Sequence, residues 1–353
     1  MNQDLQLELQ QQVHDAIAAH TPLSITGSGS KSFLGRRSQG DILSIKNHRG
    51  IISYEPTELV LTARAGTPLK EVEATLAEQQ QVLAFEPPHY GSEATLGGTI
   101  AAGLSGPRRP FAGAARDFVL GTGIINGKGE IINFGGQVMK NVAGYDVSRL
   151  MTGAMGTLGV VLQISLKVLP RTPTECSLCF DEDLSAALIR MDAWSGQPLP
   201  VSAMTWHQGQ LYIRLSGTEA GVQSARQIMG GQLLTDGESF WAKLREQQLD
   251  FFNTTEPLWR LSVPANTPAL ELPGPTLIEW GGALRWLKSE IDSDTVRAIT
   301  AAAGGHAMLY RNGDQNGEIY HPLDAGLLHL EQRVKAAFDP LGIFNPGRLY
   351  AQI

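Results

Sequence analysis

The stretch at residues 87–98 reads PPHYGSEATLGG, and it opens a glycine-rich part of the chain. Residues 91–160 hold 16 of the 39 glycines, yet short β-branched runs such as Ile124-Ile125 pass through them. Glycine inside an ordered strand costs conformational entropy. The usual compensation is a positive φ angle or a close approach of the backbone to a ligand. The stretch therefore predicts a binding site lined by backbone, and the alternative is a twisted, bulge-rich sheet with many tight turns.

Three other segments share this composition: TGSGSK at 26–31, KNVAGYD at 140–146 and GAMGTLGVV at 153–161. Small residues after a strand let successive backbone N–H groups converge on an anion. The first segment fits neither common phosphate loop. A Walker A motif needs glycine where Ser30 stands, and the dinucleotide fingerprint needs glycine where Ser32 stands. Taken alone, this segment does not identify a nucleotide.

The bulk composition excludes several classes of protein. Of the 353 residues, 42% are hydrophobic and 18% charged, as in ordinary globular chains. The net charge of −7 and the absence of a Lys/Arg-rich run argue against nucleic acid as a partner. The sequence has no run long and apolar enough for a membrane span, and its start, MNQDLQLELQQQ, has no signal-peptide pattern. We expect a cytoplasmic protein without membrane insertion, peripheral at a membrane only through partner subunits.

Hydrophobic periodicity predicts the elements of the first half. Leu5, Leu9 and Val13 recur at helical spacing, so an amphipathic helix begins the chain. Residues 23–26 read as a short strand, and Thr67-Pro68 opens a second helix with Thr67 as its N-cap.

Beyond residue 170 glycine thins out, and strands alternate with helices. Residues 201–206 and 210–215 look like paired strands joined by a turn, and 219–229 reads as a helix. Further strands are expected at 257–263, 276–280 and 306–310, and helices at 293–303 and 324–337. This pattern is typical of an α+β layer with one sheet and helices on one face.

The glycine-rich segments occur in an order that resembles a known fold. The motifs G-S-G-S, P-P-x-x-G-S-x-A-T-L-G-G, K-N-x-x-G-Y-D, G-x-x-G-T-L-G-V-V and a final N-P-G-R resemble the FAD-binding fold of the vanillyl-alcohol-oxidase, or PCMH-type, flavoproteins. The similarity covers residues 20–170 and the last fifteen. Within that family the chain is most similar to the FAD-binding subunits of bacterial glycolate oxidases, including GLSGPRRPFAGAARDFVLG at 103–121.

The resemblance implies FAD as the cofactor and assigns roles to matched positions. The amides of 27–30 and of 91–98 would hold the pyrophosphate without basic side chains, because oriented N–H dipoles attract anions. Gly144 and Tyr145 would line the flavin, 159–161 would run along the adenosine end, and Asn345 would approach the isoalloxazine. The expected cofactor-binding residues are Thr26, Gly27, Ser28, Gly29, Ser30, Lys31, Pro88, Gly91, Ser92, Thr95, Leu96, Gly97, Gly98, Gly103, Ser105, Gly144, Tyr145, Gly159, Val160, Val161 and Asn345.

The same resemblance predicts that the FAD is held non-covalently. Covalent members of the family carry histidine in the first loop, where this chain has Ser30 and Lys31. His89 is the nearby histidine, and we interpret it as a solvent-facing loop residue, with covalent attachment as the alternative.

The implied fold is α+β and has three parts. A two-subdomain PCMH-type FAD-binding domain is expected at 1–171. A smaller α+β cap domain, with an antiparallel sheet and helices on one face, is expected at 172–323. A C-terminal helix and tail at 324–353 would return to the FAD domain.

The cap lacks the catalytic motif of related dehydrogenases. Enzymes of this family that oxidise 2-hydroxy acids carry H-x-G-D-G-N-x-H and a later E-H-G, which bind a divalent metal or the substrate carboxylate. The nearest counterpart here is RNGDQNGE at 311–318, with Arg311 and Glu318 at the histidine positions and no E-H-G after it. We therefore predict no metal site and assign no catalytic residue. His306, His321 and His329 are interpreted as surface or satisfied histidines.

Cys176 and Cys179 form a C-x-x-C pair in the strand-like segment ECSLCF. The pair supplies half the thiolates of a four-cysteine site. Ordinary buried thiols are therefore favoured over a redox dithiol.

Several large or charged side chains leave two interpretations open. Arg108, Arg109 and Arg116 either hold a substrate carboxylate or a partner's acidic groups, or they form surface salt bridges. Aromatic residues of the cap are interpreted as core: Trp280, Trp286 and Tyr310.

The favoured function is an FAD-binding subunit of a glycolate oxidase (2-hydroxy-acid dehydrogenase) complex that takes part in glycolate oxidation to glyoxylate and in electron transfer. The implied partners are a larger FAD-containing catalytic subunit and an iron–sulfur subunit. The alternatives are a self-sufficient flavin-dependent 2-hydroxy-acid dehydrogenase and a non-catalytic FAD-containing scaffold.

Overall fold

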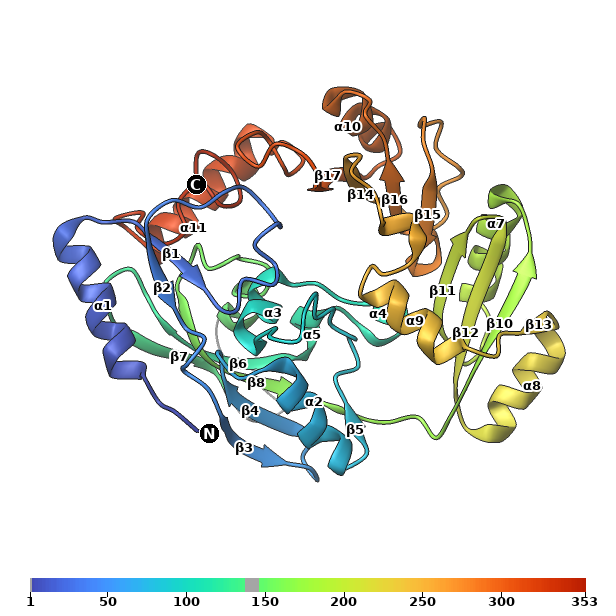
Figure 1. Cartoon of the computed structure of the whole chain (residues 1–353), viewed down its shortest axis with the longest axis horizontal. Helices are drawn as coiled ribbons and strands as arrows, with labels where there is room; N and C mark the ends of the chain where they lie inside the picture. Colours follow the sequence, from blue (N-terminus) through green and yellow to red (C-terminus); the bar gives the residue numbers. More distant parts are fainter. Residues whose placement is uncertain (1, 137–145) are drawn as a thin grey trace. The chain divides into compact units, whose positions relative to one another are not determined.

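The computed structural model describes residues 2–136 and 146–353, which form two compact units (Figure 1). The first unit consists of residues up to 104, 114–170 and 314–353. The second consists of residues 105–113 and 171–313.

The first unit contains a five-stranded antiparallel sheet in the order β3-β4-β8-β6-β7. Two smaller pairings accompany it, the parallel pair β1-β2 and the antiparallel pair β5-β9. Its strands are β1 (Leu23–Thr26), β2 (Asp41–Ser44), β3 (Ile51–Glu55), β4 (Val60–Arg64), β5 (Gln81–Val82), β6 (Val119–Ile125), β7 (Ile131–Gly135), β8 (Val160–Lys167) and β9 (Leu169–Pro170). Its helices are α1 (Gln6–Ala19), α2 (Leu69–Glu78), α3 (Leu96–Ala102), α5 (Ala115–Phe118), α6 (Val147–Leu150) and α11 (Ala325–Phe338).

The central strand β8 explains why this sheet holds together. Its sequence VVLQISLK begins with three apolar residues and then alternates apolar with polar ones, yet six of its eight residues are buried. Burial of consecutive residues means that both faces of this strand are covered. Helix α1 is confirmed, and it buries Leu9 and Val13 on one face.

Part of the glycine excess serves the sheet and not a ligand. The pairing of β6 with β8 shifts register at Gly121 and again after Gly123. A β-carbon added at Gly121 would lie 3.0 Å from the carbonyl oxygen of Gly136. These irregularities are the bulges named as the alternative for the glycine-rich stretch, and glycine accommodates them.

The second unit contains one eight-stranded antiparallel sheet in the order β13-β10-β12-β11-β15-β16-β14-β17. Its strands are β10 (Thr174–Asp181), β11 (Val201–His207), β12 (Gln210–Gly217), β13 (Gln232–Leu233), β14 (Leu258–Ser262), β15 (Thr276–Glu279), β16 (Leu284–Lys288) and β17 (His306–Arg311). Its helices are α4 (Arg109–Ala112), α7 (Leu184–Ser195), α8 (Glu219–Met229), α9 (Gly237–Arg245) and α10 (Ser293–Ala302), with 3₁₀ turns η1 (Asp250–Phe252) and η2 (Trp280–Gly282). The predicted α+β class is confirmed.

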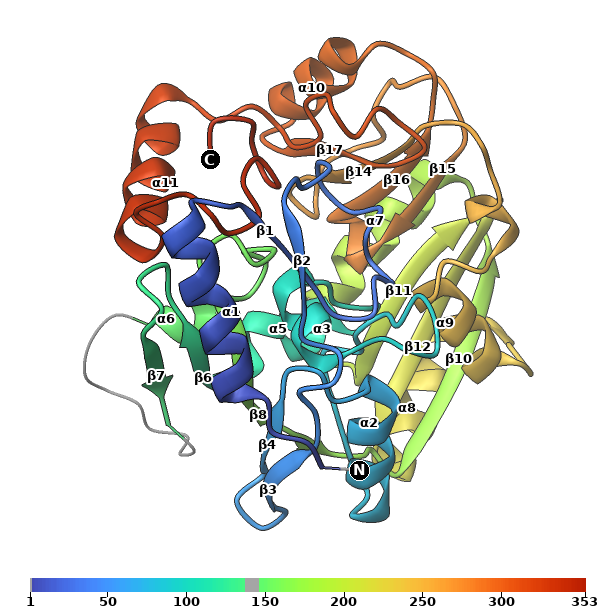
Figure 2. The same cartoon turned by 60° about the vertical axis from the view of Figure 1, so that its left-hand side comes forward.

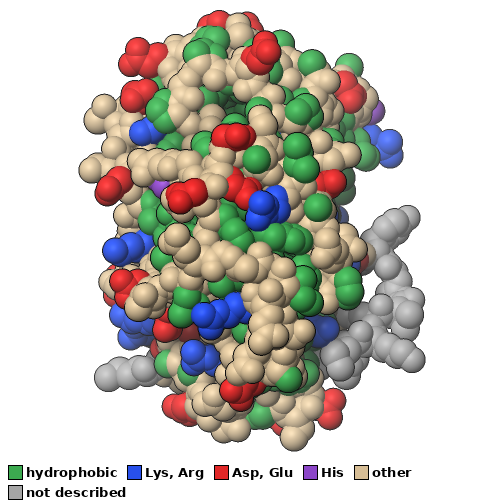
Figure 3. Space-filling view, turned by 90° about the vertical axis from the view of Figure 1, so that its right-hand side faces the viewer, with side chains coloured by type: hydrophobic (Ala, Val, Ile, Leu, Met, Phe, Trp, Pro, Cys, Tyr) green, Lys and Arg blue, Asp and Glu red, His purple; other side chains and the backbone are tan. Residues whose placement is uncertain are grey.

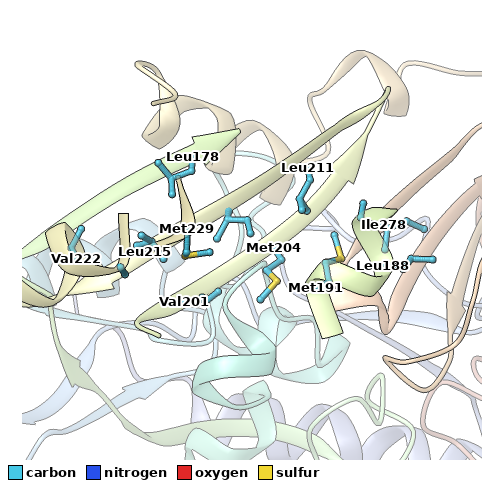
Figure 4. Close-up of a cluster of buried hydrophobic side chains, with 13 residues drawn as sticks. Leu178, Leu188, Met191, Val201, Met204, Leu211, Leu215, Val222, Met229 and Ile278 are labelled. Atoms are coloured by element: carbon cyan, nitrogen blue, oxygen red, sulfur yellow. The ribbon is translucent and has the colours of Figure 1, made fainter. Parts of the chain in front are cut away.

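Helices cover both faces of this sheet, whereas a single helical layer was expected. On one face, α7 and α8 pack against inward side chains of the sheet, such as Met204 and Leu211 (Figure 4). Leu178 belongs to this core, so its strand neighbour Ser177 points to the opposite face. Trp241 of α9 donates its indole N–H to Ser177 Oγ at 2.9 Å. Helix α9 therefore packs on the second face.

The segment 105–113 is grouped with the second unit, whereas the expected first domain included it. Two contacts explain the grouping. Trp280 donates its indole N–H to the Gly106 carbonyl at 3.0 Å, and Arg108 pairs with Glu175 at 2.9 Å. The expected cap boundary at residue 323 also differs, because residues from Asp314 onward are grouped with the first unit.

Thr67 does not cap α2, which corrects one expectation. Pro68 occupies the N-cap position. The Thr67 hydroxyl instead donates to the Arg64 carbonyl at 2.7 Å and accepts from the Gly50 amide at 2.9 Å. Its side chain thus fixes the turn after β4.

Within the described residues, no helix combines the length and apolar character needed to cross a bilayer. Exposed apolar side chains of the second unit include Ile189, Ile228 and Leu233. On the face drawn in Figure 3, hydrophobic and charged side chains are interspersed.

Candidate functional site

The first and second glycine-rich loops meet. A β-carbon added at Gly27 would lie 2.3 Å from Thr95 Oγ1, and one added at Gly91 would lie 4.0 Å from Ser30 Cβ. Gly29 has a φ of +77°, and nothing within 4 Å would contact its added β-carbon. The two loops expected to hold the pyrophosphate therefore lie side by side, with open space beside Gly29.

Lys31, one of the expected cofactor-binding residues, adds a cation to loops that were expected to act through their backbone amides. Its side chain is only 8% exposed, although lysine is rarely buried. The ammonium donates to the His89 carbonyl at 3.1 Å and lies 5.8 Å from the centre of the Tyr90 ring. Lys31 therefore links the two loops and brings positive charge to their junction.

Gly97 does not present a free amide, which corrects the expected role of this position. Its N–H donates to the Ala65 carbonyl at 2.7 Å, and an added β-carbon would lie 2.7 Å from Ala65 Cβ. The Gly98 N–H donates to the Thr95 hydroxyl at 3.2 Å, and the Leu96 N–H donates to the Thr67 carbonyl. Glycine at 97 thus permits α3 to pack against the end of β4.

The fourth glycine-rich segment packs against the end of α3. Gly103 ends the helix with a φ of +64°, and an added β-carbon there would lie 2.9 Å from Gly153 Cα. The Gly153 N–H donates to the Ile100 carbonyl at 3.0 Å. Nothing lies within 4 Å of a β-carbon added at Gly153, so this backbone also faces open space.

Asn345 joins three segments that are far apart in the sequence. Its side-chain oxygen accepts from the Ile25 N–H at 2.8 Å, and its amide nitrogen donates to the Met155 carbonyl at 2.6 Å. It is 3% exposed and has a φ of +40°. The structure therefore gives Asn345 a structural role, and its approach to the isoalloxazine stays a prediction.

A buried ion pair fixes the tail that carries Asn345. The Lys335 ammonium donates to Asp339 Oδ2 at 2.8 Å and to the Thr157 and Phe344 carbonyls at 2.7 Å each. Burial lowers the pKa of Lys335, and Asp339 partly offsets this. Figure 2 shows α11 and this tail returning to the first unit, where the Leu23 N–H donates to the Ile343 carbonyl.

Three buried hydroxyls test whether these surroundings suit a polar cofactor. Within the described residues, Thr99, Thr122 and Thr152 each have a buried Oγ1 without a hydrogen-bond partner. Buried polar groups are normally satisfied, so such atoms call for a further partner. Thr99 lies in α3 and Thr152 directly precedes Gly153. Together with the open glycine backbone, they fit a polar ligand bound at these loops.

The remaining expected positions divide into several groups. Val160 and Val161 are buried on β8, where they pair with Ile125 and Ile124 of β6. A β-carbon added at Gly159 would lie 2.9 Å from the Ile125 carbonyl, so glycine is needed there for packing. Gly144 and Tyr145 lie outside the described residues. Four further positions stay predicted cofactor contacts: Thr26, Ser28, Pro88 and Ser92. Ser105 also stays one, although it is grouped with the second unit.

His89 is not a freely solvent-facing histidine. Its side chain is 16% exposed, and Nε2 lies 2.9 Å from Glu73 Oε2. The pair joins α2 to the second loop.

The segment RNGDQNGE forms a turn held by side-chain hydrogen bonds. The Asn316 N–H donates to Asp314 Oδ1, and the Gln315 side chain donates to the Phe33 carbonyl at 2.7 Å. Among the residues that the structure describes, no group of three or more metal-ligating side chains occurs.

The two cysteines are free and half-buried on β10. Burial raises the pKa of both thiols. Because the thiolate is the reactive form, this disfavours a redox role.

The aromatic cap residues are core, as expected, since Trp280, Trp286 and Tyr310 are at most 6% exposed. Sequence reasoning missed their neighbour Glu279, which accepts a hydrogen bond from Trp286 Nε1 at 2.6 Å. Burial raises the pKa of Glu279 to about 7, with Trp286 and Arg260 opposing the shift. A single glutamate within a strand carries no periodic signal, so nothing in the sequence pointed to it.

Comparison with known proteins agrees with this architecture. A family model described as an FAD binding domain matches residues 6–135. The glycolate oxidase subunit GlcE of Escherichia coli is 51% identical over 350 residues, covering 99% of each chain. The glycolate oxidase subunit GlcD of Bacillus subtilis is 32% identical over 150 residues, covering 42% of this chain and 32% of that protein.

The fold is shared with a solved structure of p-cresol methylhydroxylase with substrate bound. Its TM-score is 0.71 at 15% identity, covering 100% of this chain and 88% of the other. The expected PCMH-type fold and the expected cofactor, FAD, are thereby confirmed. The chain belongs to the FAD-binding family of the glycolate oxidase subunit GlcE.

Proposed function

We propose that this chain is the FAD-binding subunit of a glycolate oxidase complex and takes part in the oxidation of glycolate to glyoxylate. The observation that carries the proposal is the 51% identity to the Escherichia coli subunit over nearly the whole of both chains. Identity of this extent supports a shared architecture. The convergence of the glycine-rich loops supports it independently.

In this proposal the FAD is held non-covalently by the loops of the first unit. The backbone at 26–31 and 91–98, with the Lys31 ammonium, would hold the pyrophosphate. Residues 153–161 would lie along the cofactor, and Asn345 would keep the tail beside them. Bound flavin supplies a two-electron acceptor, and the protein supplies its binding, orientation and surroundings.

The names of the relatives support a multisubunit complex. The Escherichia coli relative is one subunit of a glycolate oxidase, and a differently named glycolate oxidase subunit from Bacillus subtilis is a more distant relative. We propose that this chain joins a larger FAD-containing catalytic subunit and an iron–sulfur subunit. Any contact with a membrane would be made through them from the cytoplasmic side.

The test combines a spectrum with reconstitution. The purified full-length chain is expected to show flavin absorbance, and flavin is expected to leave on mild denaturation because no covalent bond holds it. Glycolate-dependent reduction of an electron acceptor is expected to require this chain when the partners are supplied. A chain that takes up no FAD, or a complex fully active without it, would refute the proposal.

A self-sufficient 2-hydroxy-acid dehydrogenase is the second candidate. Arg109, Arg260 and Glu279 of the second unit favour it, because they gather cations and a titratable carboxyl around one tryptophan. It predicts that glycolate or D-lactate bleaches the flavin of the isolated chain under anaerobic conditions. Failure of any such acid to bleach the flavin would leave the first proposal in place.

A further inference from the structure

The Lys335 ammonium, in the last turn of α11, has an acceptor for each of its three N–H groups. It donates to Asp339 Oδ2 at 2.8 Å and to the carbonyl oxygens of Thr157 and Phe344 at 2.7 Å each. Lys335 is 7% exposed, and a lysine side chain has three donors and no acceptor. The three bonds therefore satisfy this ammonium completely inside the first unit.

The Asp339 carboxylate folds the chain back at the end of the same helix. Its Oδ1 accepts from the Ile343 N–H at 3.1 Å, and its Oδ2 accepts from the Phe344 N–H at 2.8 Å. The Gly127 N–H donates to the Phe338 carbonyl at 2.8 Å, and a β-carbon added at Gly127 would lie 2.5 Å from Asp339 Cα. The turn between α11 and the tail is therefore fixed by its own hydrogen bonds and by the turn after β6.

Asn345 extends this connection to two of the glycine-rich segments. Its side chain accepts from the Ile25 N–H at 2.8 Å, one residue before the first segment, and donates to the Met155 carbonyl of the fourth segment at 2.6 Å. The fourth segment is held a second time close by, because Lys335 binds the Thr157 carbonyl. Both segments are therefore tied to the C-terminal tail.

Together Lys335, Asp339 and Asn345 form a tail clamp. A buried ion pair contributes little net stability, because the cost of removing both charges from water offsets their attraction. Burial lowers the pKa of Lys335, and Asp339 opposes this shift. What the pair does fix is geometry, because each hydrogen bond requires its partner at a defined distance and angle. The tail clamp therefore determines where the fourth segment and the tail lie.

We propose that Lys335 and Asp339 are positioning residues of the FAD site: they hold the fourth glycine-rich segment and the tail in the arrangement that binds the cofactor. The inference rests on the proposed function, in which residues 153–161 lie along FAD. A backbone cradle attracts an anion only where its N–H groups converge, so a small displacement of one segment weakens binding. Neither side chain needs to touch FAD, because both act through the segments that they hold.

The first test measures FAD affinity in the full-length chain. Lys335→Met keeps the length of the side chain and removes its three donors. We expect the dissociation constant for FAD, followed by flavin fluorescence, to rise about tenfold or more, because members of one hydrogen-bond network are coupled by free energies of that order. Lys335→Arg should not restore the parent affinity, since a planar guanidinium directs its bonds differently from an ammonium. Parent-like affinity in Lys335→Met would overturn the proposal.

Two controls separate positioning from a general loss of stability. Leu76→Ala removes a fully buried side chain from α2 and so destabilises the first unit. Lys128→Met removes an exposed ammonium from the turn after β6. Where circular dichroism shows that each FAD-free chain is folded, both controls should bind FAD as the parent does. A rise in the dissociation constant as large in Leu76→Ala as in Lys335→Met would make the role of Lys335 merely structural and overturn the proposal.

Asp339 is tested in a double-mutant cycle with Lys335. Asp339→Asn keeps the shape of the side chain and removes its charge. If the two side chains act as one unit, the double variant should raise the dissociation constant for FAD no more than Lys335→Met does alone. Effects of the two substitutions that multiply would show independent actions and contradict the shared role.

The parent chain provides a measurement that does not depend on the folding of any variant. FAD should slow hydrogen exchange at the amides of residues 343–345, which are bonded to Asp339 and Leu23, because coupling between the clamp and FAD acts in both directions. Unchanged exchange there with FAD bound would overturn this inference and leave the proposed function in place. A parent chain that takes up no FAD would refute the proposed function and this inference with it.

Discussion

At the scale of the residue, the structure reveals two buried ionisable side chains whose burial the sequence did not predict. Lys31 is 8% exposed and Glu279 is 5% exposed, and neither lies on the solvated surface where such residues usually occur. Burying a charge is unfavourable unless a partner compensates it. Each therefore marks a place where the protein accepts a local cost in free energy.

Lys31→Met should separate folding from cofactor binding. If the ammonium helps to hold the pyrophosphate, the dissociation constant for FAD should rise roughly 10- to 100-fold, because hydrogen bonds to charged groups contribute about 1.5–3 kcal/mol. The stability of the FAD-free chain should change little, because the variant loses the hydrogen bond of Lys31 to the His89 carbonyl but also avoids the cost of burying a charge. Lys46→Met, at an exposed lysine paired with Glu93, is the control. Unchanged FAD affinity in Lys31→Met would contradict this role.

Glu279 should make stability fall with rising pH. Below pH 4.5 its carboxyl is protonated in both the folded and the unfolded chain. Between that pH and about 7 the unfolded chain releases the proton first, so unfolding becomes easier. The shift from 4.5 to about 7 corresponds to about 3 kcal/mol of stability lost by neutral pH.

Denaturant titrations of the parent and of Glu279→Gln between pH 4 and pH 8 measure this effect. The amide keeps an acceptor for Trp286 and cannot ionise, so the variant should gain stability relative to the parent as pH rises. Glu238→Gln, at an exposed position of α9, should follow the parent. A constant difference between the parent and Glu279→Gln across this range would show that Glu279 titrates normally.

At the scale of the element, α3 shows how glycine serves packing and binding in adjacent positions. Gly97→Ala places a β-carbon 2.7 Å from Ala65 Cβ and 2.9 Å from its carbonyl oxygen, so α3 must shift from β4. We expect a loss of about 1–3 kcal/mol, as for other overpacked sites. Gly98→Ala meets only the Thr95 hydroxyl at 3.1 Å and gains helix propensity of about 0.5–1 kcal/mol, so its stability should hardly change.

Thermal unfolding of the two glycine variants decides the matter. The variant at 97 should unfold several degrees below the parent, and the variant at 98 should stay near it. The reverse order would mean that Gly97 is kept for the ligand and not for packing against Ala65.

The elements also show what the sequence could predict. Apolar periodicity located α1, α8, α10 and the hairpin of β11 and β12, because each buries one face of its own sequence. It missed β16, whose sequence LRWLK alternates less clearly. Arg285 in that strand is buried, and three backbone carbonyls satisfy its guanidinium. No local pattern shows such partners in advance.

The candidate cofactor site also has features that the sequence predicted and features that it did not. Small residues in a family-specific order predicted which loops converge, and the contacts of Gly27 with Thr95 and of Gly91 with Ser30 agree. Three features of the site depend on residues far away in the chain. They are the burial of Lys31, the hydrogen bond of the Gly97 amide to Ala65 and the hydrogen bonds of the Asn345 side chain. Their roles needed the three-dimensional structure.

At the scale of the whole molecule, the proposed function assigns FAD binding to one of the two units. The loops expected to bind FAD belong to the first unit, and the segments that surround Trp280 belong to the second. Each unit has its own sheet and its own buried core. FAD bound by the first unit should therefore protect that unit and leave the second largely unchanged.

Hydrogen exchange followed by mass spectrometry measures this protection peptide by peptide. At a concentration about 100 times its dissociation constant, FAD stabilises the folded state by about 2.7 kcal/mol. Amides that exchange only when the FAD-binding region opens should therefore exchange much more slowly. We expect slower exchange in peptides covering 26–31, 91–98 and 153–161, and little change in β10–β13. Protection by FAD spread evenly over both units would contradict this division, because a cofactor held by the first unit alone stabilises the second only through coupling between them.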